Sequence, residues 1–189
     1  SWKKHMPDYE YILWNESKIS EIDSVFIKEA IAEKKWAFAS DVIRLYALYN
    51  YGGIYLDTDV MAYKSFNPLL SNHAFMGREN SLHIIGKSTI NYLTTCCFAA
   101  EKHNPFIHRC LNYYNERHFI TSHDKTLPVE LRLDLTLNSA IICRLAQDLG
   151  YNPSALANVY QSCNNNVLTI YPSQYFDSVK VTSETYCKH

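Results

Sequence analysis

Hydrophobic residues recur at helical spacing from residue 24 to residue 51. The pattern predicts two helices that meet near Lys34 and Lys35. In the second helix, apolar side chains return every three or four positions, so one stripe of the helix should face the protein core. The residues of this stripe are Phe38, Val42, Leu45 and Tyr49.

The end of the second helix leads directly into a candidate strand. Gly52 and Gly53 are typical of a helix C-terminus, because glycine adopts the left-handed conformations that stop a helix. Ile54–Leu56 then predicts a short, buried strand in the centre of a sheet. Asp57 and Asp59 follow at once, so two carboxylates should lie at the exit of a central strand.

Helical and strand-like patterns alternate along the rest of the chain. The predicted elements are a strand at 9–14, strands within 74–99, helices at 105–115 and 136–149, a strand at 167–171 and an irregular or extended tail. Such alternation, without repeats or linkers, predicts one α/β domain over residues 1–189. We expect a mainly parallel central sheet flanked by helices.

Composition narrows the class of protein. Hydrophobic residues make up 47% of the chain and aromatic residues 14%, which is typical of an ordered globular protein. The 18 basic and 19 acidic residues are interspersed and give a net charge of -1. Nucleic acid is therefore not an expected partner, because its binding needs a broad basic surface. No run approaches the about 20 apolar residues that cross a bilayer.

The six cysteines lack the paired short spacing of zinc sites. Cys96 and Cys97 are neighbours and would point to opposite faces of a strand. We interpret the cysteines as buried thiols of a protein from a reducing compartment.

Asp57 and Asp59 are the strongest candidates for chemistry. Two carboxylates on either side of one residue at a strand end suit a single hard cation, Mg²⁺ or Mn²⁺. Such a cation would hold a diphosphate and neutralise the negative charge that develops when a nucleotide-sugar bond breaks. Taken alone, an Asp-x-Asp pattern is more often a pair of solvated acids in a turn.

The sequence around this pair is more specific. Residues 40–60 read SDVIRLYALYNYGGIYLDTDV, and this helix, double glycine, strand and DxD closely resemble the sugar-binding region of glycosyltransferase family 32. The family includes yeast-type α-mannosyltransferases, bacterial capsular-polysaccharide transferases and relatives of the clostridial glucosylating toxins. Weaker similarity at residues 1–10, 104–106 and 172–176 extends the resemblance over nearly the whole chain.

The resemblance implies a GT-A-like nucleotide-diphospho-sugar transferase fold and a metal-dependent hexosyltransferase. Such an enzyme moves a sugar from a nucleotide-diphosphate donor to a saccharide acceptor with retention of anomeric configuration, using Mn²⁺ or Mg²⁺. By the same resemblance, Asp57 and Asp59 bind the metal beside His189. Asp41 and Arg44 contact the donor sugar or its diphosphate, where a guanidinium makes paired charge-assisted hydrogen bonds.

Several of these candidate residues have a structural alternative. Asp41 and Arg44 are three positions apart and also suit an ion pair on the helix surface. Tyr55 and Trp14 suit core packing as well as binding of the nucleotide by stacking. Asn138 suits the acceptor side of the substrate cleft as well as a buried helix cap.

Two family segments have no counterpart in this sequence. Nothing matches the opening strand of pattern IPKxIHxxW, and the closing pattern HHxxGSW is represented by its first histidine, His189. The domain is therefore expected to be shortened at both ends. We expect peripheral membrane association through the absent segments, with a cytoplasmic location at the inner membrane face in a bacterium or a Golgi lumen location in a eukaryote.

Two other functions fit parts of the pattern. A haloacid-dehalogenase-type phosphatase also uses Asp-x-Asp after a buried strand, but it requires Thr or Val where Met61 stands. A sugar-binding module without turnover is favoured by the shortened ends. Release of free nucleoside diphosphate from a donor would separate the enzyme from the binding module.

Overall fold

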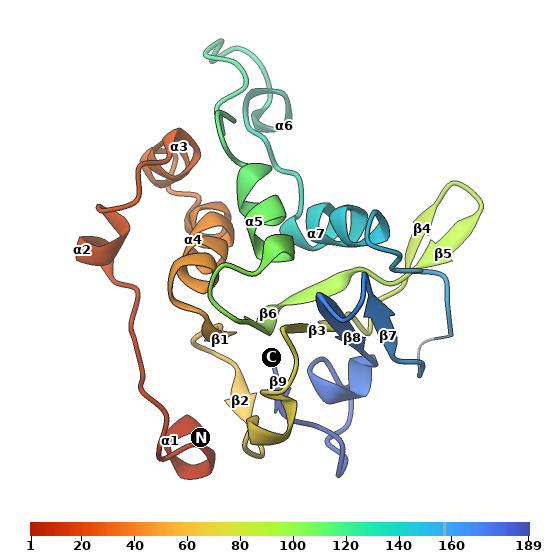
Figure 1. The fold of residues 1–189 in the computed structure, drawn as a ribbon. Helices are drawn as coiled ribbons and strands as arrows, with labels where there is room; N and C mark the ends of the chain where they lie inside the picture. Colours follow the sequence, from red (N-terminus) through yellow and green to blue (C-terminus); the bar gives the residue numbers. More distant parts are fainter. Residues whose placement is uncertain (157) are drawn as a thin grey trace.

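A five-stranded sheet forms the centre of the molecule (Figure 1). The computed structural model describes residues 1–156 and 158–189. The order of the strands across the sheet is β1-β6-β3-β8-β7. Their bounds are β1 (Gly53–Leu56), β3 (Ala74–Arg78), β6 (Leu93–Ala100), β7 (Gln161–Cys163) and β8 (Leu168–Tyr171).

Most neighbouring strands in this sheet run antiparallel. β3 and β8 are parallel, whereas β1 with β6, β3 with β6 and β7 with β8 run in opposite directions. The fold is mixed α/β as predicted, but the prediction of a mainly parallel sheet is wrong. β3 reaches β6 through a hairpin of β4 (His83–Ile85) and β5 (Ser88–Ile90), and β7 reaches β8 through a turn at 164–166. Connections without a crossover helix favour antiparallel neighbours.

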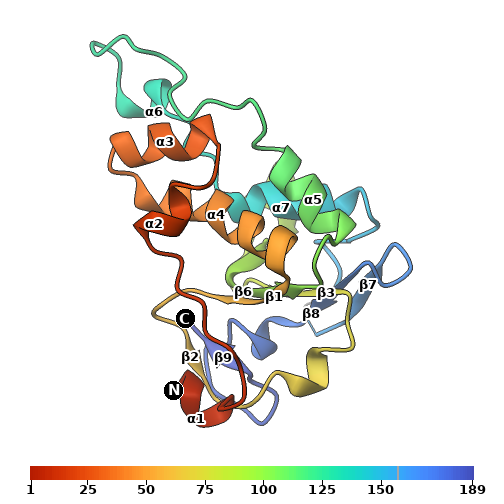
Figure 2. The same cartoon turned by 60° about the vertical axis from the view of Figure 1, so that its left-hand side comes forward.

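Helices cover one face of the sheet, and short segments cover the other (Figure 2). The helical layer consists of α3 (Val25–Ala32), α4 (Trp36–Tyr51), α5 (Pro105–Asn112) and α7 (Asn138–Gln147). The opposite layer consists of α1 (Trp2–His5), β2 (Met61–Ala62), η1 (Asn67–Leu69), η2 (Ser173–Tyr175) and β9 (Cys187–Lys188). Two further short helices are α2 (Glu16–Ile19) and α6 (Val129–Arg132).

Each face of the sheet has its own hydrophobic cluster. Met76 and Phe98 are paired across β3 and β6 and belong to the cluster under the helices. Phe75 and Cys97 are their neighbours in sequence and belong to the cluster on the opposite face. Successive side chains of a strand point to opposite faces, so one short strand stabilises both layers.

The two helices predicted over residues 24–51 are confirmed as α3 and α4. The Ser24 hydroxyl begins α3 by accepting a hydrogen bond from the Ile27 N–H at 3.3 Å. Lys34, with a φ of 57°, separates the two helices. In the predicted stripe of α4, Val42 and Leu45 are buried, and the other two side chains pack partly buried against the same cluster.

α4 ends at Gly52, as the double glycine predicts. Gly52 has a φ of 71°, and a Cβ atom there would lie 2.7 Å from the backbone nitrogen of Lys102. Backbone conformation and close approach both require glycine at this position. The chain therefore turns from α4 straight into β1.

Two strand predictions are wrong. Tyr9–Trp14 forms no strand, and Tyr11, Ile12 and Leu13 within it are exposed. Aromatic and branched residues make a strand where a neighbouring strand supplies hydrogen-bond partners, and no described segment pairs with this one. β1 is an edge strand rather than a central one, since β6 is its one neighbour among the described strands.

The six cysteines are all buried and free, as predicted. Their assignment to a reducing compartment stays a prediction. Within the described ranges, no helix combines the length and the apolar character that crossing a membrane requires.

Candidate active site

The turn after β1 holds the two acidic residues of the DxD motif. The Asp57 N–H donates to the Cys96 carbonyl at 2.8 Å and so extends the ladder between β1 and β6. The chain then turns, with the Val60 N–H donating to the Asp57 carbonyl at 3.0 Å. Trp2 anchors the turn from α1, because its Nε1 donates to the Val60 carbonyl at 2.7 Å. Asp57 and Asp59 thus project from a backbone that is fixed on two sides.

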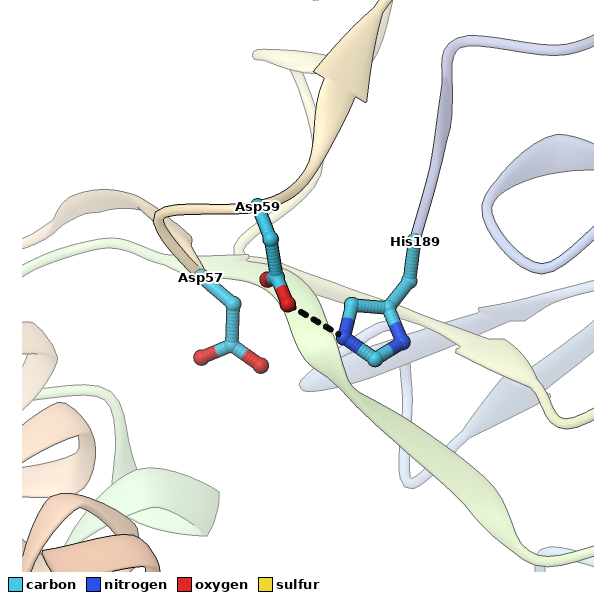
Figure 3. A group of neighbouring side chains, drawn as sticks. All are labelled: Asp57, Asp59 and His189. Carbon is cyan, nitrogen blue, oxygen red and sulfur yellow. Dashed lines mark hydrogen bonds and ion pairs between the residues drawn. The ribbon is translucent and has the colours of Figure 1, made fainter.

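His189 lies beside this turn, although it is 130 positions from Asp59 in sequence. β9 pairs with β2, which follows the turn, and this pairing brings the C-terminal histidine back to the motif. His189 Nε2 lies 3.1 Å from Asp59 Oδ2, and Figure 3 shows the carboxylate pointing at the ring. One ligand atom from each of Asp57, Asp59 and His189 lies within 4.8 Å of the others. The structure therefore brings the three predicted metal ligands together.

The three side chains suit a divalent cation. Ligand distances of about 2.0–2.6 Å put donor atoms on opposite sides of one ion about 4–5 Å apart. Groups within 4.8 Å of one another therefore need small side-chain rotations to share an ion. Asp59 and His189 are exposed and Asp57 is half-buried, so an ion and an anionic ligand would reach the site from solvent.

Arg44 connects α4 to both the sheet and the motif. It is buried, with 5% of its surface exposed. Its Nη1 donates to the Thr95 carbonyl of β6 at 2.6 Å, and its Nε donates to the Ser40 carbonyl at 3.1 Å. Its Nη2 lies 3.3 Å from Asp41 Oδ1 and 3.5 Å from Asp57 Oδ1. The ion pair of Asp41 and Arg44 is therefore present, but inside the site and not on the helix surface.

Asp41 is a carboxylate held in a largely desolvated position, with 16% of its side chain exposed. Burial raises the pKa of Asp41 from a usual value of 3.8 to about 6, against the lowering effect of Arg44. The nearby charge of Asp57 raises this pKa further, and the amide of Asn138 lowers it. A desolvated carboxylate beside a second one is a strong hydrogen-bond acceptor with few donors to satisfy it.

Tyr55 contacts the motif directly. Its hydroxyl donates to Asp57 Oδ1 at 2.7 Å, and its ring lies 4.8 Å from the guanidinium carbon of Arg44. Burial raises the pKa of Tyr55, so the hydroxyl stays protonated and keeps its role as donor. The ring packs against the cluster under the helices, as the core-packing alternative predicts. The hydroxyl in addition orients the first aspartate.

Trp14 packs on the helical layer. Its ring meets Tyr46 and Tyr51 edge-on, with ring centroids 6.0 Å and 5.5 Å apart, and the Lys18 ammonium lies 5.6 Å from its centroid. These contacts favour the core-packing alternative over stacking on a nucleotide.

Asn138 is buried at the start of α7, with 3% of its surface exposed. Leu137 occupies the N-cap position of that helix, so the helix-cap alternative for Asn138 is wrong. The Tyr114 hydroxyl donates to Asn138 Oδ1 at 3.1 Å, and the amide is close enough to Asp41 to lower the pKa of that carboxyl. The contact of Tyr114 with Asn138 could not be predicted from the sequence. Tyr114 follows α5 whereas Asn138 begins α7, and nothing in the sequence distinguishes Tyr114 from an ordinary core aromatic residue.

A pocket of about 500 Å³ adjoins the DxD turn. Its volume lies within the range of small-molecule sites. α1 forms one wall and the turn forms the other, and the lining residues are Ser1, Trp2, Lys3, Lys4, Thr58, Asp59, Val60 and Met61. Space for a ligand is therefore present on the Asp59 side of the motif.

The part of the chain that contains this turn matches a known protein family. Residues 1–76 match the family described as "Glycosyltransferase sugar-binding region containing DXD motif". This part of the chain is therefore similar to a glycosyltransferase sugar-binding region. The DXD motif implies a divalent metal ion, and the sugar-binding region implies binding of a sugar substrate. The resemblance inferred from the sequence is confirmed.

Two proteins of Schizosaccharomyces pombe are among those similar to this chain. Inositol phosphoceramide mannosyltransferase 3 is 37% identical over 78 residues, which are 39% of this chain and 22% of that protein. Inositol phosphoceramide mannosyltransferase 1 is 29% identical over 133 residues, which are 63% of this chain and 38% of that protein. The chain thus spans less than two fifths of the length of either relative.

A solved structure, "PaToxG Glycosyltransferase", also resembles this chain. It shares 24% sequence identity and a TM-score of 0.40, over 66% of this chain and 40% of that one. A TM-score this low does not establish a shared fold.

Proposed function

We propose that this chain is the sugar-transferring part of a metal-dependent glycosyltransferase. It would move a sugar from a nucleotide-diphosphate donor to a hydroxyl of a saccharide acceptor. The observation that carries the proposal is the convergence of Asp57, Asp59 and His189, with ligand atoms within 4.8 Å of one another. Both aspartates lie in the region that matches the glycosyltransferase family.

The ligand set favours Mn²⁺ over Mg²⁺. Carboxylate oxygens suit both ions, whereas an imidazole nitrogen is a ligand typical of transition metals. When bound, the ion would neutralise the charge that develops on the departing nucleoside diphosphate. Asp57 is held for this task by Tyr55 at 2.7 Å, since partners of a metal ligand fix its orientation.

Asp41 and Arg44 would act on the sugar side of the donor. Asp41 offers a desolvated carboxylate that accepts a hydrogen bond from a sugar hydroxyl. Arg44 is fixed by the Thr95 and Ser40 carbonyls, so it contributes a stationary positive charge between Asp41 and Asp57. Fixed charges need no reorganisation during the reaction, which makes them effective in stabilising a transition state.

The remaining details of the reaction rest on resemblance. We infer retention of anomeric configuration and a GT-A-like arrangement from glycosyltransferase family 32, and proton NMR of the product anomer tests the former. Mannose is the first donor sugar to test, because the relatives are named as mannosyltransferases. A location at the cytoplasmic membrane face or in the Golgi lumen stays a prediction, tested by fractionation of cells that express the protein.

The deciding experiment is an assay of nucleoside diphosphate release. The protein is incubated with a panel of uridine and guanosine diphosphate sugars, with Mn²⁺ or with EDTA. We expect Mn²⁺-dependent release from at least one donor. Calorimetric binding of a donor without release would instead identify a sugar-binding module, and absence of both would contradict the proposal. The match of residues 1–76 to a glycosyltransferase region argues against the phosphatase alternative.

A further inference from the structure

The Asn138 side-chain amide has a hydrogen-bond partner for its oxygen but not for its nitrogen. Its oxygen accepts a hydrogen bond from the Tyr114 hydroxyl at 3.1 Å. Its nitrogen, Nδ2, is buried and has no hydrogen-bond partner among the residues that the structure describes. A buried amide N–H without a partner destabilises the folded state, because it has lost its hydrogen bond to water. An amide kept in this state therefore suggests a ligand atom that completes it.

The unpaired nitrogen lies beside an acceptor that also lacks a full set of partners. The Asn138 amide is close enough to Asp41 to lower the pKa of its carboxyl, yet the two make no well-formed hydrogen bond. A donor and an acceptor side by side match one hydroxyl group, whose oxygen accepts and whose hydrogen donates. A sugar presents such groups on its ring.

Tyr114 determines which way the amide points. Its ring is buried and packs edge-on against Phe26, with centroids 5.0 Å apart, and against Tyr113, at 5.2 Å. Its hydroxyl is therefore held at one position and directs the Asn138 oxygen toward itself. If the amide turned over, its oxygen would face the Asp41 carboxylate, and two acceptors would repel each other.

We propose that Tyr114 is a positioning residue that holds the Asn138 amide so that Nδ2 and the Asp41 carboxylate together clamp one hydroxyl of the donor sugar. This inference rests on the proposed function. It assigns sugar specificity to the buried Asn138 and Tyr114 and the partly buried Asp41, which come from three separate segments. A donor lacking the clamped hydroxyl would leave both polar groups unpaired, and buried polar sites discriminate strongly against such analogues.

The test uses Tyr114→Phe, which removes the hydroxyl and keeps the ring. The best nucleotide sugar and its monodeoxy analogues are compared by kcat/KM in wild type, Tyr114→Phe and Asn138→Ala. In wild type, removal of one particular hydroxyl from the donor sugar should lower kcat/KM about 100-fold. In Tyr114→Phe, KM for the parent donor should rise about tenfold, and the preference for the parent over that one analogue should fall about tenfold. Asn138→Ala should show the same loss of preference.

Tyr113→Phe is the matched control, because Tyr113 is the neighbouring residue and its hydroxyl forms no hydrogen bond with a described residue. It should keep the wild-type preference at every position. An equal loss for the parent and all analogues in Tyr114→Phe, or a lowered melting temperature with unchanged preference, would overturn the clamp. If the chain binds donors without turning them over, the ratio of the Kd of each analogue to that of the parent donor tests the clamp independently of the proposed function. If wild type neither binds nor turns over any donor, both are overturned.

Discussion

Two carboxylates of the site share one buried guanidinium. Arg44 lies 3.3 Å from Asp41 and 3.5 Å from Asp57, while its other N–H groups bond backbone carbonyls. One positive charge therefore stands against two negative ones. The surplus negative charge favours a cation at Asp57 and a hydroxyl donor at Asp41.

The raised pKa predicts that ionised Asp41 destabilises the folded, metal-free protein. Its pKa is about 6 when folded and near 3.8 when unfolded, so the folded state binds the proton more tightly. The free energy of unfolding therefore falls as pH rises through this interval, and the loss is complete above it. Asp41→Asn removes the loss and should be more stable than wild type by about 1–2 kcal/mol at about pH 8, with the difference shrinking toward about pH 4.

Urea denaturation in EDTA measures this difference. Asp23→Asn is the control, because Asp23 is exposed and its pKa is lowered by a hydrogen bond from Lys28. It should give no stabilisation at high pH. A stability difference for Asp41→Asn that is the same at both pH values would contradict the role of burial.

The hydroxyl of Tyr55 should support metal binding without touching the metal. Tyr55→Phe keeps the ring beside Arg44 and removes the hydrogen bond to Asp57 Oδ1. Loss of a group that orients a metal ligand commonly lowers affinity about 10- to 100-fold, and calorimetry of Mn²⁺ binding measures it. Tyr46→Phe is the control, because the Tyr46 ring packs against Trp14, and it should leave the affinity unchanged. Unchanged affinity in Tyr55→Phe would exclude the orienting role.

Some of these residue roles could be predicted from the sequence. Asp57 and Asp59 could be predicted from the motif, and Tyr55 lies two positions before Asp57, where side chains of a strand share a face. The bond between Tyr55 and Asp57 was therefore predictable from strand geometry. The contact of Tyr114 with Asn138 was not, since it depends on how two separate helical segments pack.

At the scale of elements, the junction of α4 and β1 depends on two glycines with different surroundings. A Cβ at Gly52 would lie 2.7 Å from the Lys102 nitrogen, whereas one at Gly53 would meet nothing within 4 Å. Both have positive φ, of 71° and 99°. Gly52→Ala should therefore destabilise the protein by about 1–3 kcal/mol more than Gly53→Ala. Equal melting temperatures for the two variants would show that the close approach at Gly52 is not tight.

The pairing of β2 with β9 delivers His189 to the motif. We expect His189→Ala to weaken Mn²⁺ binding about tenfold, the effect of losing one ligand worth about 1.4 kcal/mol. Calorimetry measures the affinity, and His123→Ala, an exposed histidine elsewhere, should match wild type. An unchanged affinity in His189→Ala would remove this residue from the ligand set.

Local sequence patterns predicted helices better than strand pairing. α3, α4 and the glycine stop depend on neighbours in sequence, and these predictions are confirmed. The strand at Tyr9–Trp14, the central place of β1 and the parallel sheet are wrong, because each depends on which distant segment supplies hydrogen bonds. β9 also depends on a distant partner: the sequence predicts an irregular or extended tail there, but not its pairing with β2.

At the scale of the whole molecule, the candidate site lies where the two layers meet at the β1 edge of the sheet. The helical layer supplies Asp41, Arg44 and Asn138, and the opposite layer supplies His189 (Figures 1 and 3). The DxD turn passes from one to the other. Each layer has its own hydrophobic cluster, so the substrate-side residues and the metal-side histidine are held by separate cores.

We propose that Asp57, Asp59 and His189 hold the divalent cation on which donor turnover depends. The most direct test of this proposal is the rate of nucleoside diphosphate release against Mn²⁺ concentration in wild type, Asp59→Asn and the exposed control Asp23→Asn. We expect Mn²⁺-dependent release in wild type and Asp23→Asn, and a loss of about 100-fold or more in Asp59→Asn with its fold intact. Release by Asp59→Asn at the wild-type rate and with the wild-type Mn²⁺ dependence would contradict the proposal.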